Sequence, residues 1–267
     1  MATGSDVRTA IVTGAASGIG RRVAETFAEE GYAVLCADLA GSEVAALADE
    51  LSKAGLLAQS LTVDVSDEAQ MKSMAEAAIQ WTGRIDAVAA NAGIMVEGDA
   101  LSLSLEDWNR VMAVNATGAF LTARATLPHL IDAGGTLVFT ASTVGLVGMR
   151  GVAGYSASKG AVVALTRQLA ADYAESGVRV NAVAPGAVKT PLSESQFRAR
   201  ARDDAHFEEL MQAVIARYPI GRFGTTDDVA RTIAFLALFL VPIVNVRVLT
   251  KDDFGLYRQF WLLFDSV

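Results

Sequence analysis

The fold is decided by residues 9–31, which read TAIVTGAASGIGRRVAETFAEEG. Thr9–Thr13 is a short, apolar, β-branched run that predicts a strand buried on both faces. Glycines follow it, and the next segment has helical periodicity up to Gly31. Such glycines let backbone approach a ligand closely, and the helix N-terminus offers free N–H groups and a positive dipole end. We therefore expect a phosphate-binding turn at residues 13–20, although its spacing differs from G-x-G-x-x-G.

An acidic residue follows this turn at the end of the next predicted strand. The second predicted strand, Tyr32–Ala37, ends in Asp38, which lies 20 residues after Gly18. A carboxylate at that position is placed to bind the ribose 2′-OH of an adenine dinucleotide and would repel a 2′-phosphate. No Arg or Lys lies in residues 15–17, and Leu39 follows the acid. The sequence thus favours NAD over NADP, and Asp38 is also suited to cap the next helix.

Strands and helices alternate through the rest of the chain. Further strands are expected at 56–63, 85–90, 136–140 and 178–184, and helices at 42–54, from a Ser66 cap to 81, at 104–133 and from 155 onward. This alternation predicts an α/β fold with a single Rossmann-like, doubly wound parallel sheet flanked by helices. Ligands bind such sheets outside the carboxyl ends of the strands. Asp38, Asp64, Asn91 and Ser142 all fall at those ends.

A phenol and an ammonium group lie four residues apart in the stretch STVGLVGMRGVAGYSASK, residues 142–159. On a helix, Tyr155 and Lys159 would share one face. A nearby cation lowers the pKa of a phenol from its usual value of about 10, as general acid–base catalysis near neutrality requires. In isolation, the same spacing more often means a surface tyrosine beside a solvated lysine.

Composition excludes several classes of protein. The 267 residues are 52% hydrophobic and carry a net charge of −8 without basic runs, which argues against a nucleic-acid partner. The single cysteine, Cys36, permits no internal disulfide, and two histidines with one cysteine predict no zinc site. The N-terminus lacks the apolar core of a signal peptide, so a cytoplasmic protein is expected.

Taken together, the motifs resemble those of the short-chain dehydrogenase/reductases from about Val7 to Ala237. The resemblance rests on TGAASGIG at 13–20, Asp38, Asp64-Val65, NAG at 91–93, Asn115, Ser142, YSASK at 155–159 and PG at 185–186. The separations of 27, 13 and 4 residues between Asn115, Ser142, Tyr155 and Lys159 fit the catalytic spacing of that family.

The resemblance implies a reversible oxidation of a secondary alcohol to a ketone with NAD, and a role for each matching residue. Tyr155 would be the acid/base, Ser142 would bind the substrate oxygen, Lys159 would bind the nicotinamide ribose and lower the pKa of Tyr155, and Asn115 would hold a relay water. The resemblance also implies a homo-oligomer. The residues implied to contact the cofactor are Gly14, Ser17, Gly18, Ile19, Asp38, Asp64, Val65, Asn91, Tyr155, Lys159, Val188 and Thr190.

Two segments are implied to line the substrate pocket. Residues 143–152 are mostly apolar with one arginine, Arg150, which we interpret as a solvated loop residue. Residues 191–218 predict a charged helical lid. The substrate is expected to be a small-molecule alcohol or ketone, and an apolar pocket with a cationic rim would suit a hydrophobic alcohol or one with an acidic tail. A reductase of 3-oxoacyl thioesters is the alternative, and Asp38 weighs against it because reductive biosynthesis usually uses NADPH.

The chain departs from the family pattern near residue 238. We therefore divide it into a catalytic domain, 1–237, and an atypical tail, 238–267, which reads LFLVPIVNVRVLTKDDFGLYRQFWLLFDSV. The tail faintly resembles the start of polysaccharide flippases, but its apolar run is shorter than a membrane span of about 20 residues. A replacement edge strand or a foreign C-terminus is an open alternative. A foreign tail would impair assembly, which leaves a nucleotide-binding protein without turnover as the competing hypothesis.

Overall fold

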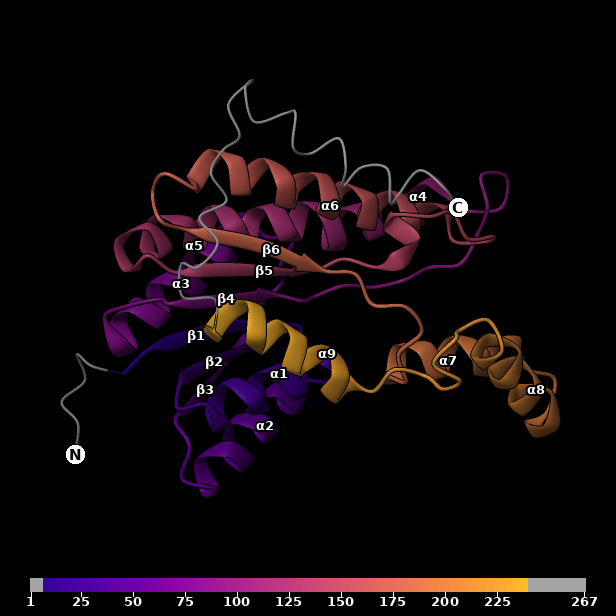
Figure 1. Cartoon of the computed structure of the whole chain (residues 1–267), viewed down its shortest axis with the longest axis horizontal. Helices are drawn as coiled ribbons and strands as arrows, with labels where there is room; N and C mark the ends of the chain where they lie inside the picture. The colour runs from indigo at the N-terminus through magenta and orange to yellow at the C-terminus, as the bar shows by residue number, and fades with distance from the viewer. Residues whose placement is uncertain (1–6, 240–267) are drawn as a thin grey trace.

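The computed structural model describes residues 7–239, and its centre is a six-stranded parallel sheet (Figure 1). The strand order is β3-β2-β1-β4-β5-β6, so the order reverses direction between β1 and β4. This topology confirms the predicted doubly wound α/β fold. The strands are β1 Thr9–Thr13, β2 Ala33–Asp38, β3 Ala58–Thr62, β4 Ala87–Ala90, β5 Thr136–Thr140 and β6 Arg179–Val183.

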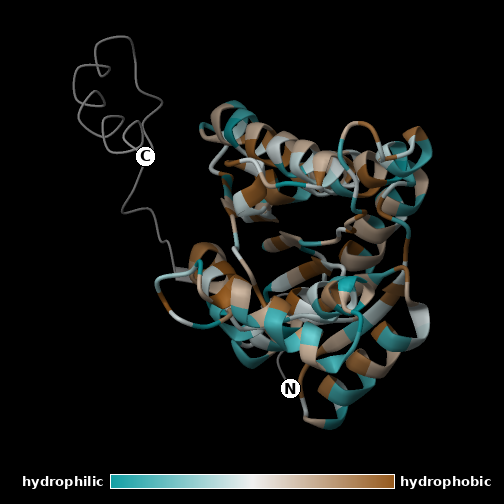
Figure 2. Cartoon of the chain, turned by 90° about the vertical axis from the view of Figure 1, so that its right-hand side faces the viewer, coloured by the Kyte–Doolittle hydropathy of each residue, from teal (hydrophilic) through white to brown (hydrophobic). Residues whose placement is uncertain are grey.

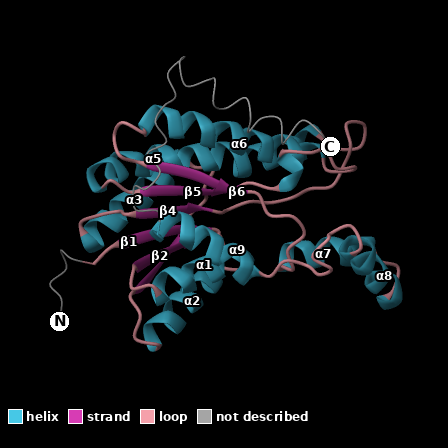
Figure 3. Ribbon diagram, viewed as in Figure 1, coloured by secondary structure: helices cyan, strands magenta, loops and turns pink. Residues whose placement is uncertain are grey.

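Helices cover both faces of the sheet (Figure 3). The elements α1, α2 and α9 lie on one face, and α3, α5 and α6 lie on the other. The helices are α1 Gly18–Glu29, α2 Gly41–Lys53, α3 Glu68–Thr82, α4 Leu105–Met112, α5 Gly118–Ala133, α6 Ala153–Tyr173, α7 Pro191–Arg200, α8 Asp204–Ile215 and α9 Thr226–Ala234. The pair α7 and α8 projects beyond the carboxyl end of the sheet, where the charged lid was predicted.

Alternate residues of the central strands enter two separate hydrophobic cores, as the period of two in a strand requires. In β1, Ala10 and Val12 pack with α1, α2 and α9, whereas Ile11 packs with the helices of the opposite face. All three side chains are fully buried. In Figure 2, hydrophobic residues gather along the strands, and hydrophilic residues mark the outer sides of the helices. Burial on both faces explains why the sequences of the central strands β1, β2, β4 and β5 are mostly apolar, whereas β3 and β6 at the edges of the sheet are partly exposed.

One helix begins one residue after the predicted cap. The side chain of Asp67, and not that of Ser66, accepts the Gln70 N–H at the start of α3. Ser66 is engaged elsewhere, because its hydroxyl donates to Asp64 Oδ1 at 2.7 Å. At α9 the N-cap is Thr225, which forms a reciprocal capping box with Asp228.

The single helix predicted over 104–133 is divided in the structure. Ser104 caps α4 as expected, but a π-helical turn, Ala113–Thr117, separates α4 from α5. Asn115 is buried within this turn. An interruption of this kind widens the helix by one residue and often marks a functional site. The sequence pattern missed it because apolar periodicity continues on both sides.

Gly20 is the glycine of the turn with the least room for a side chain. A methyl group there would overlap the carbonyl oxygen of Gly14 and the side-chain amide of Asn91. Gly14 itself has a φ of 68°, in the left-handed region that favours glycine. The turn therefore requires glycine at one position for backbone conformation and at another for close packing.

Gly20→Ala is expected to lower the free energy of unfolding by about 2–3 kcal/mol, because overpacking a rigid backbone contact forces the turn to shift. The matched control is Gly160→Ala in α6, where a methyl group would meet the Gly145 carbonyl oxygen at an ordinary 3.5 Å. That control should be neutral or stabilise by up to about 1 kcal/mol through helix propensity. Denaturant midpoints measure both changes, and equal midpoints for the two variants would contradict the packing argument.

Candidate active site

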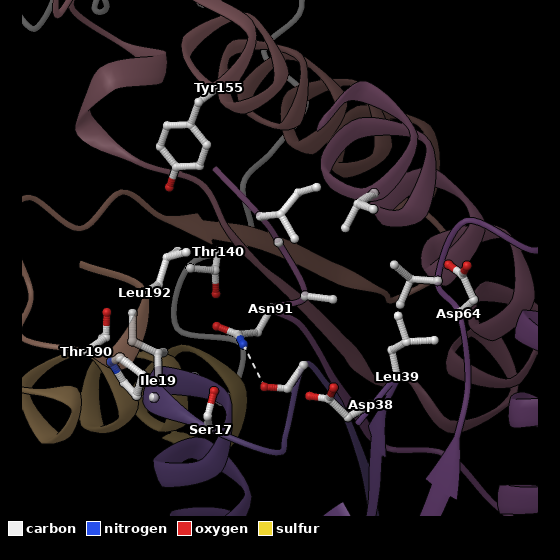
Figure 4. A pocket seen from close by; sticks show the side chains of 18 of the residues that line it. Ser17, Ile19, Asp38, Leu39, Asp64, Asn91, Thr140, Tyr155, Thr190 and Leu192 are labelled. Carbon is white, nitrogen blue, oxygen red and sulfur yellow. Dashed lines mark hydrogen bonds between the residues drawn. The ribbon is translucent and has the colours of Figure 1, made fainter. Parts of the chain in front are cut away.

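A cleft of about 310 Å³ lies over the carboxyl ends of the strands, where the strand order reverses (Figure 4). It extends from Asp38 past the glycine turn to Tyr155. Most of the predicted cofactor residues line it, although they come from distant parts of the chain. Those that do are Gly14, Ser17, Gly18, Ile19, Asp38, Asp64, Val65, Asn91, Tyr155, Lys159 and Thr190.

The glycine turn leads directly into α1. Ser17 is the N-cap residue of α1, and its side chain makes no capping hydrogen bond. The first amides of α1 therefore receive no partner from the cap, and Ser17, Gly18 and Ile19 line the cleft. This is the arrangement in which a helix N-terminus binds a phosphate group.

The carboxylate of Asp38 is held by the backbone on two sides. Its Oδ2 accepts the Ala16 N–H at 2.8 Å, and its Oδ1 accepts the Ala40 N–H at 3.0 Å. These bonds fix the carboxylate at one end of the cleft and connect it to the glycine turn. The neighbouring Leu39 is 69% exposed and also lines the cleft. Of the described residues that line the cleft, Lys159 alone is a lysine or arginine, and it lies at the Tyr155 end.

Asn91 fastens the end of β4 to the glycine turn. Its Nδ2 donates to the carbonyl oxygens of Thr13 and Gly14, each at 3.3 Å, and its backbone N–H donates to Thr13 Oγ1 at 3.1 Å (Figure 4). The side-chain oxygen has no hydrogen bond in this network and lies in the cleft. Asn91 thus closes the switch point of the sheet and presents one acceptor to a ligand.

Tyr155 and Lys159 share one face of α6, as their spacing predicted. The Lys159 Nζ lies 5.8 Å from the centroid of the Tyr155 ring and donates to the Thr140 carbonyl oxygen at 2.6 Å. The phenol points into the cleft. Ser142 lies on the turn after β5, and its hydroxyl donates to the Pro185 carbonyl oxygen at 3.5 Å. The structure therefore assembles a hydroxyl, a phenol and a buried ammonium group at one end of the cleft.

The ionisable groups at this end are shifted by burial. Burial raises the pKa of the Tyr155 phenol above its ordinary value, and the Ser142 hydroxyl acts in the opposite direction. Burial also lowers the pKa of Lys159 to about 8. Desolvation of the phenol therefore dominates the net shift of the Tyr155 pKa, and the lowering of that pKa by Lys159 stays a prediction.

Asn115 lies behind Lys159 and holds two segments together. Its Oδ1 accepts the Ile94 N–H at 2.8 Å, and its Nδ2 donates to the Ile94 carbonyl oxygen at 2.8 Å and to Ser158 Oγ at 2.9 Å. A small cavity of about 10 Å³ is lined by Asn115, Lys159 and Thr140. The Thr140 hydroxyl is buried without a partner. A space of this size with polar walls accommodates one water molecule.

Three predicted site residues lie outside the lining of the main cleft. Ser142 and Asn115 adjoin it as described above, and Val188 is buried in a backbone bridge to Gly224. Sequence reasoning missed several residues that do line the cleft. Thr140 had a usable signal, because it lies at the carboxyl end of β5 two residues before Ser142. The other missed residues are Leu39, Val63, Ile94 and Val114, whereas Ala92 and Gly93 belong to the predicted NAG motif and Pro191 and Leu192 to the segment implied to line the substrate pocket.

Exposed apolar side chains occur in both segments that were implied to line the substrate pocket. Leu146, Val147 and Met149 are exposed in the loop between Ser142 and Tyr155, and Leu192, at the start of α7, is exposed and lines the cleft. Arg200 at the end of α7 pairs with Glu97, with a 2.9 Å hydrogen bond from Nε to Oε2. This pair connects the lid to the segment that follows β4.

Known proteins share both the sequence and the fold. A family model described as enoyl-(acyl carrier protein) reductase matches residues 14–253. A cis-4-hydroxycyclohexanecarboxylate dehydrogenase from Sinomonas cyclohexanicum is 39% identical over 92% of this chain and 95% of its own. A 3-oxoacyl-[acyl-carrier-protein] reductase from Thermotoga maritima is 36% identical over 85% of this chain and 89% of its own. The chain belongs to the short-chain dehydrogenase/reductase family.

Comparison with solved structures supports the same family assignment. The crystal structure of levodione reductase covers 87% of this chain and 90% of its own with a TM-score of 0.80 and 32% identity. As a short-chain dehydrogenase/reductase, the chain is an oxidoreductase of a family that acts on alcohols and ketones and generally uses nicotinamide cofactors.

Two further findings concern the described part of the chain. Between residues 7 and 239, no helix is both long and apolar enough to cross a membrane. The same residues contain no group of three or more His, Cys, Asp or Glu side chains arranged to hold a metal ion. The predicted atypical tail falls almost wholly on residues 240–267, which lie outside the described residues, and the family-model match continues to residue 253.

Proposed function

We propose that this protein is an NAD-dependent dehydrogenase that interconverts a secondary alcohol and its ketone. The observation that carries the proposal is the convergence of Tyr155, Ser142 and Lys159 at one end of a cleft whose other end holds the Asp38 carboxylate. The separation of these ends along one continuous cleft suits an extended dinucleotide with its reactive ring beside the phenol.

The Tyr155 phenol and the Ser142 hydroxyl would both contact the substrate oxygen, and each would have a different role there. Tyr155 takes the alcohol proton in oxidation and returns it to the ketone oxygen in reduction. Ser142 donates a hydrogen bond to that oxygen as negative charge develops on it. The nicotinamide ring, when bound, supplies the carbon that accepts or gives the hydride. Tyr155 is partly buried and lines the cleft, so its hydroxyl is within reach of a bound substrate.

Lys159 and Asn115, behind the phenol, would bind the cofactor ribose and hold a water molecule for proton transfer. The Lys159 ammonium uses one donor on Thr140, so its other N–H groups are available for cofactor ribose hydroxyls. The small cavity beside Asn115 and the unpartnered Thr140 hydroxyl support a relay water between Lys159 and Asn115. Proton exchange with solvent would pass through this water.

The cofactor proposed is NAD. The pyrophosphate would be held by Gly14, Ser17, Gly18 and Ile19. Asp38 would accept hydrogen bonds from the two hydroxyls of the adenine ribose. Asp64 and Val65 would border the adenine, and Asn91, Val188 and Thr190 would contact the remainder. The site fits NAD better than NADP because a 2′-phosphate would lie beside the Asp38 carboxylate without a cation among the described lining residues.

The substrate class proposed is a saturated cyclic secondary alcohol. The apolar loop residues 146–149 and Leu192 support a carbocyclic substrate, and the relative from Sinomonas cyclohexanicum is named for a hydroxycyclohexane carboxylate. The alternative is reduction of 3-oxoacyl thioesters, which the Thermotoga maritima relative and the family description favour.

We also propose a homo-oligomer, because Leu105, Trp108 and Phe120 leave exposed apolar surface on α4 and α5.

A substrate panel tests the proposal. Purified protein is assayed with NAD and NADP against cyclohexanol, cis-4-hydroxycyclohexanecarboxylate and butan-2-ol, and with NADH and NADPH against a 3-oxoacyl thioester. We expect NAD-dependent turnover that is at least about 10-fold more efficient on the cyclic alcohols than on butan-2-ol, the scale of discrimination that a hydrophobic pocket supplies. Preferential NADPH-dependent reduction of the thioester would replace this proposal with the alternative. Binding of NADH without any turnover would favour the impaired nucleotide-binding protein.

A further inference from the structure

The lid leaves the body of the protein and returns to it through two segments that lie side by side. It leaves after Val188 and returns at Gly224, and these two residues form a backbone bridge. The Lys189 N–H donates to the Gly224 carbonyl oxygen at 2.9 Å, and the Gly224 N–H donates to that of Ala187 at 2.9 Å. Helices α7 and α8 therefore form an excursion closed at its base (Figure 1).

The side chain of Tyr218 adds a further contact where these two segments meet. The Ala187 N–H donates to the hydroxyl oxygen of Tyr218 at 3.0 Å. The ring of the same tyrosine covers Gly186, where an added Cβ would lie 2.7 Å from Tyr218 Cε1. Gly186 is absent from the glycines with positive φ, so the tyrosine ring, and not the backbone conformation, excludes a side chain there.

The segment that Tyr218 holds lies between both halves of the candidate site. On one side, the Pro185 carbonyl oxygen accepts the Ser142 hydroxyl at 3.5 Å and the Thr143 N–H at 3.1 Å. On the other side, Thr190 lines the cleft only three residues after Ala187. A displacement of Ala187 would therefore move the acceptor of Ser142 and the cleft wall together.

We propose that Tyr218 is a positioning residue that sets the 185–190 segment for catalysis. It acts through Ala187 and Gly186 and does not touch the reacting atoms. The inference rests on the proposed function for its catalytic consequence. Its structural step, the clamp on the Ala187 amide, stands on the hydrogen bond and the packing alone. A purely structural tyrosine would affect stability without a specific effect on turnover or cofactor affinity.

The test compares Tyr218→Phe with Tyr173→Phe. The first keeps the ring over Gly186 and removes the acceptor of the Ala187 N–H. The second removes a phenol hydroxyl from the far end of α6, about 27 Å along the helix from Tyr155 at 1.5 Å per residue. Three quantities are measured for each: hydrogen exchange at the Ala187 amide, the dissociation constant for NADH, and kcat and KM with the best alcohol of the panel.

We expect Tyr218→Phe to speed exchange at Ala187 by about 2- to 10-fold, the effect of losing one net hydrogen bond. The NADH dissociation constant should rise about 3-fold and kcat should fall about 3- to 10-fold, because small displacements reduce near-attack geometry. Tyr173→Phe should leave all three unchanged. Unchanged Ala187 exchange would overturn the clamp, and faster exchange with unchanged kcat and NADH affinity would overturn the positioning role. Exchange and NADH binding need no substrate, so an inactive wild type would refute the proposed function separately.

Discussion

Tyr155→Phe is expected to lower kcat for alcohol oxidation by about 10³-fold, within the range supplied by a positioned acid/base. The substitution keeps the buried ring and removes only the proton-transfer group. Binding of NADH should therefore stay close to that of the wild type, and fluorescence titration of the nucleotide measures it. Steady-state rates of the two proteins with the same alcohol measure the loss.

The pH dependence of the wild type follows from the same group. Since burial raises the Tyr155 pKa, the deprotonated phenol that accepts the alcohol proton becomes more populated as pH rises. Oxidation should accelerate toward alkaline pH, while reduction, which needs the protonated phenol, should not.

Ser142→Ala provides the matched control for Tyr155→Phe, because it should lower the rate without removing the acid/base. A Tyr155→Phe enzyme with wild-type turnover would contradict the role given to the phenol.

Removing the charge at residue 38 is expected to weaken the preference for NAD. Asp38→Asn keeps a similar shape and one acceptor oxygen for the Ala16 N–H, but it removes the negative charge and the second acceptor oxygen, which receives the Ala40 N–H. Loss of charged hydrogen bonds to ribose should reduce kcat/KM with NAD by about 10- to 100-fold. Use of NADP should improve at the same time, because the repulsion of a 2′-phosphate is gone.

Leu39→Arg in the Asp38→Asn background should extend this change. Leu39 is 69% exposed, so an arginine can be accommodated there without opening the core, and its guanidinium would pair with a 2′-phosphate. The double variant should prefer NADP, and Leu39→Gln in the same background is the uncharged control. Ratios of kcat/KM for the two cofactors measure the effect. A wild type that already prefers NADP would contradict the assignment of Asp38.

The fold was predictable because its strands are locally consistent. Strands such as Thr9–Thr13 read as continuous apolar runs, and the structure buries them on both faces. The spacing of Tyr155 and Lys159 also placed both on one helix face correctly. Periodicity and spacing are properties of neighbouring residues, so a single sequence contains them.

Features that depend on contacts between distant residues could not be predicted. The π turn around Asn115 is stabilised by the backbone of Ile94, 21 residues away, and by Ser158. The raised Tyr155 pKa depends on how deeply the tertiary structure buries the ring. Tyr218 contacts Ala187 across the whole lid, and no local pattern marks it. In each case the sequence names the residue but not its partner.

The central claim is that a hydride passes directly between an alcohol carbon and the nicotinamide beside Tyr155. The most direct test incubates the protein with NAD and cyclohexanol that carries deuterium on its carbinol carbon, followed by mass spectrometry of the recovered nucleotide. The account predicts NADH with one deuterium on the nicotinamide ring, formed by the wild type and nearly abolished in Tyr155→Phe. Recovery of unlabelled NADH, or of labelled NADH at equal rates from both proteins, would contradict it.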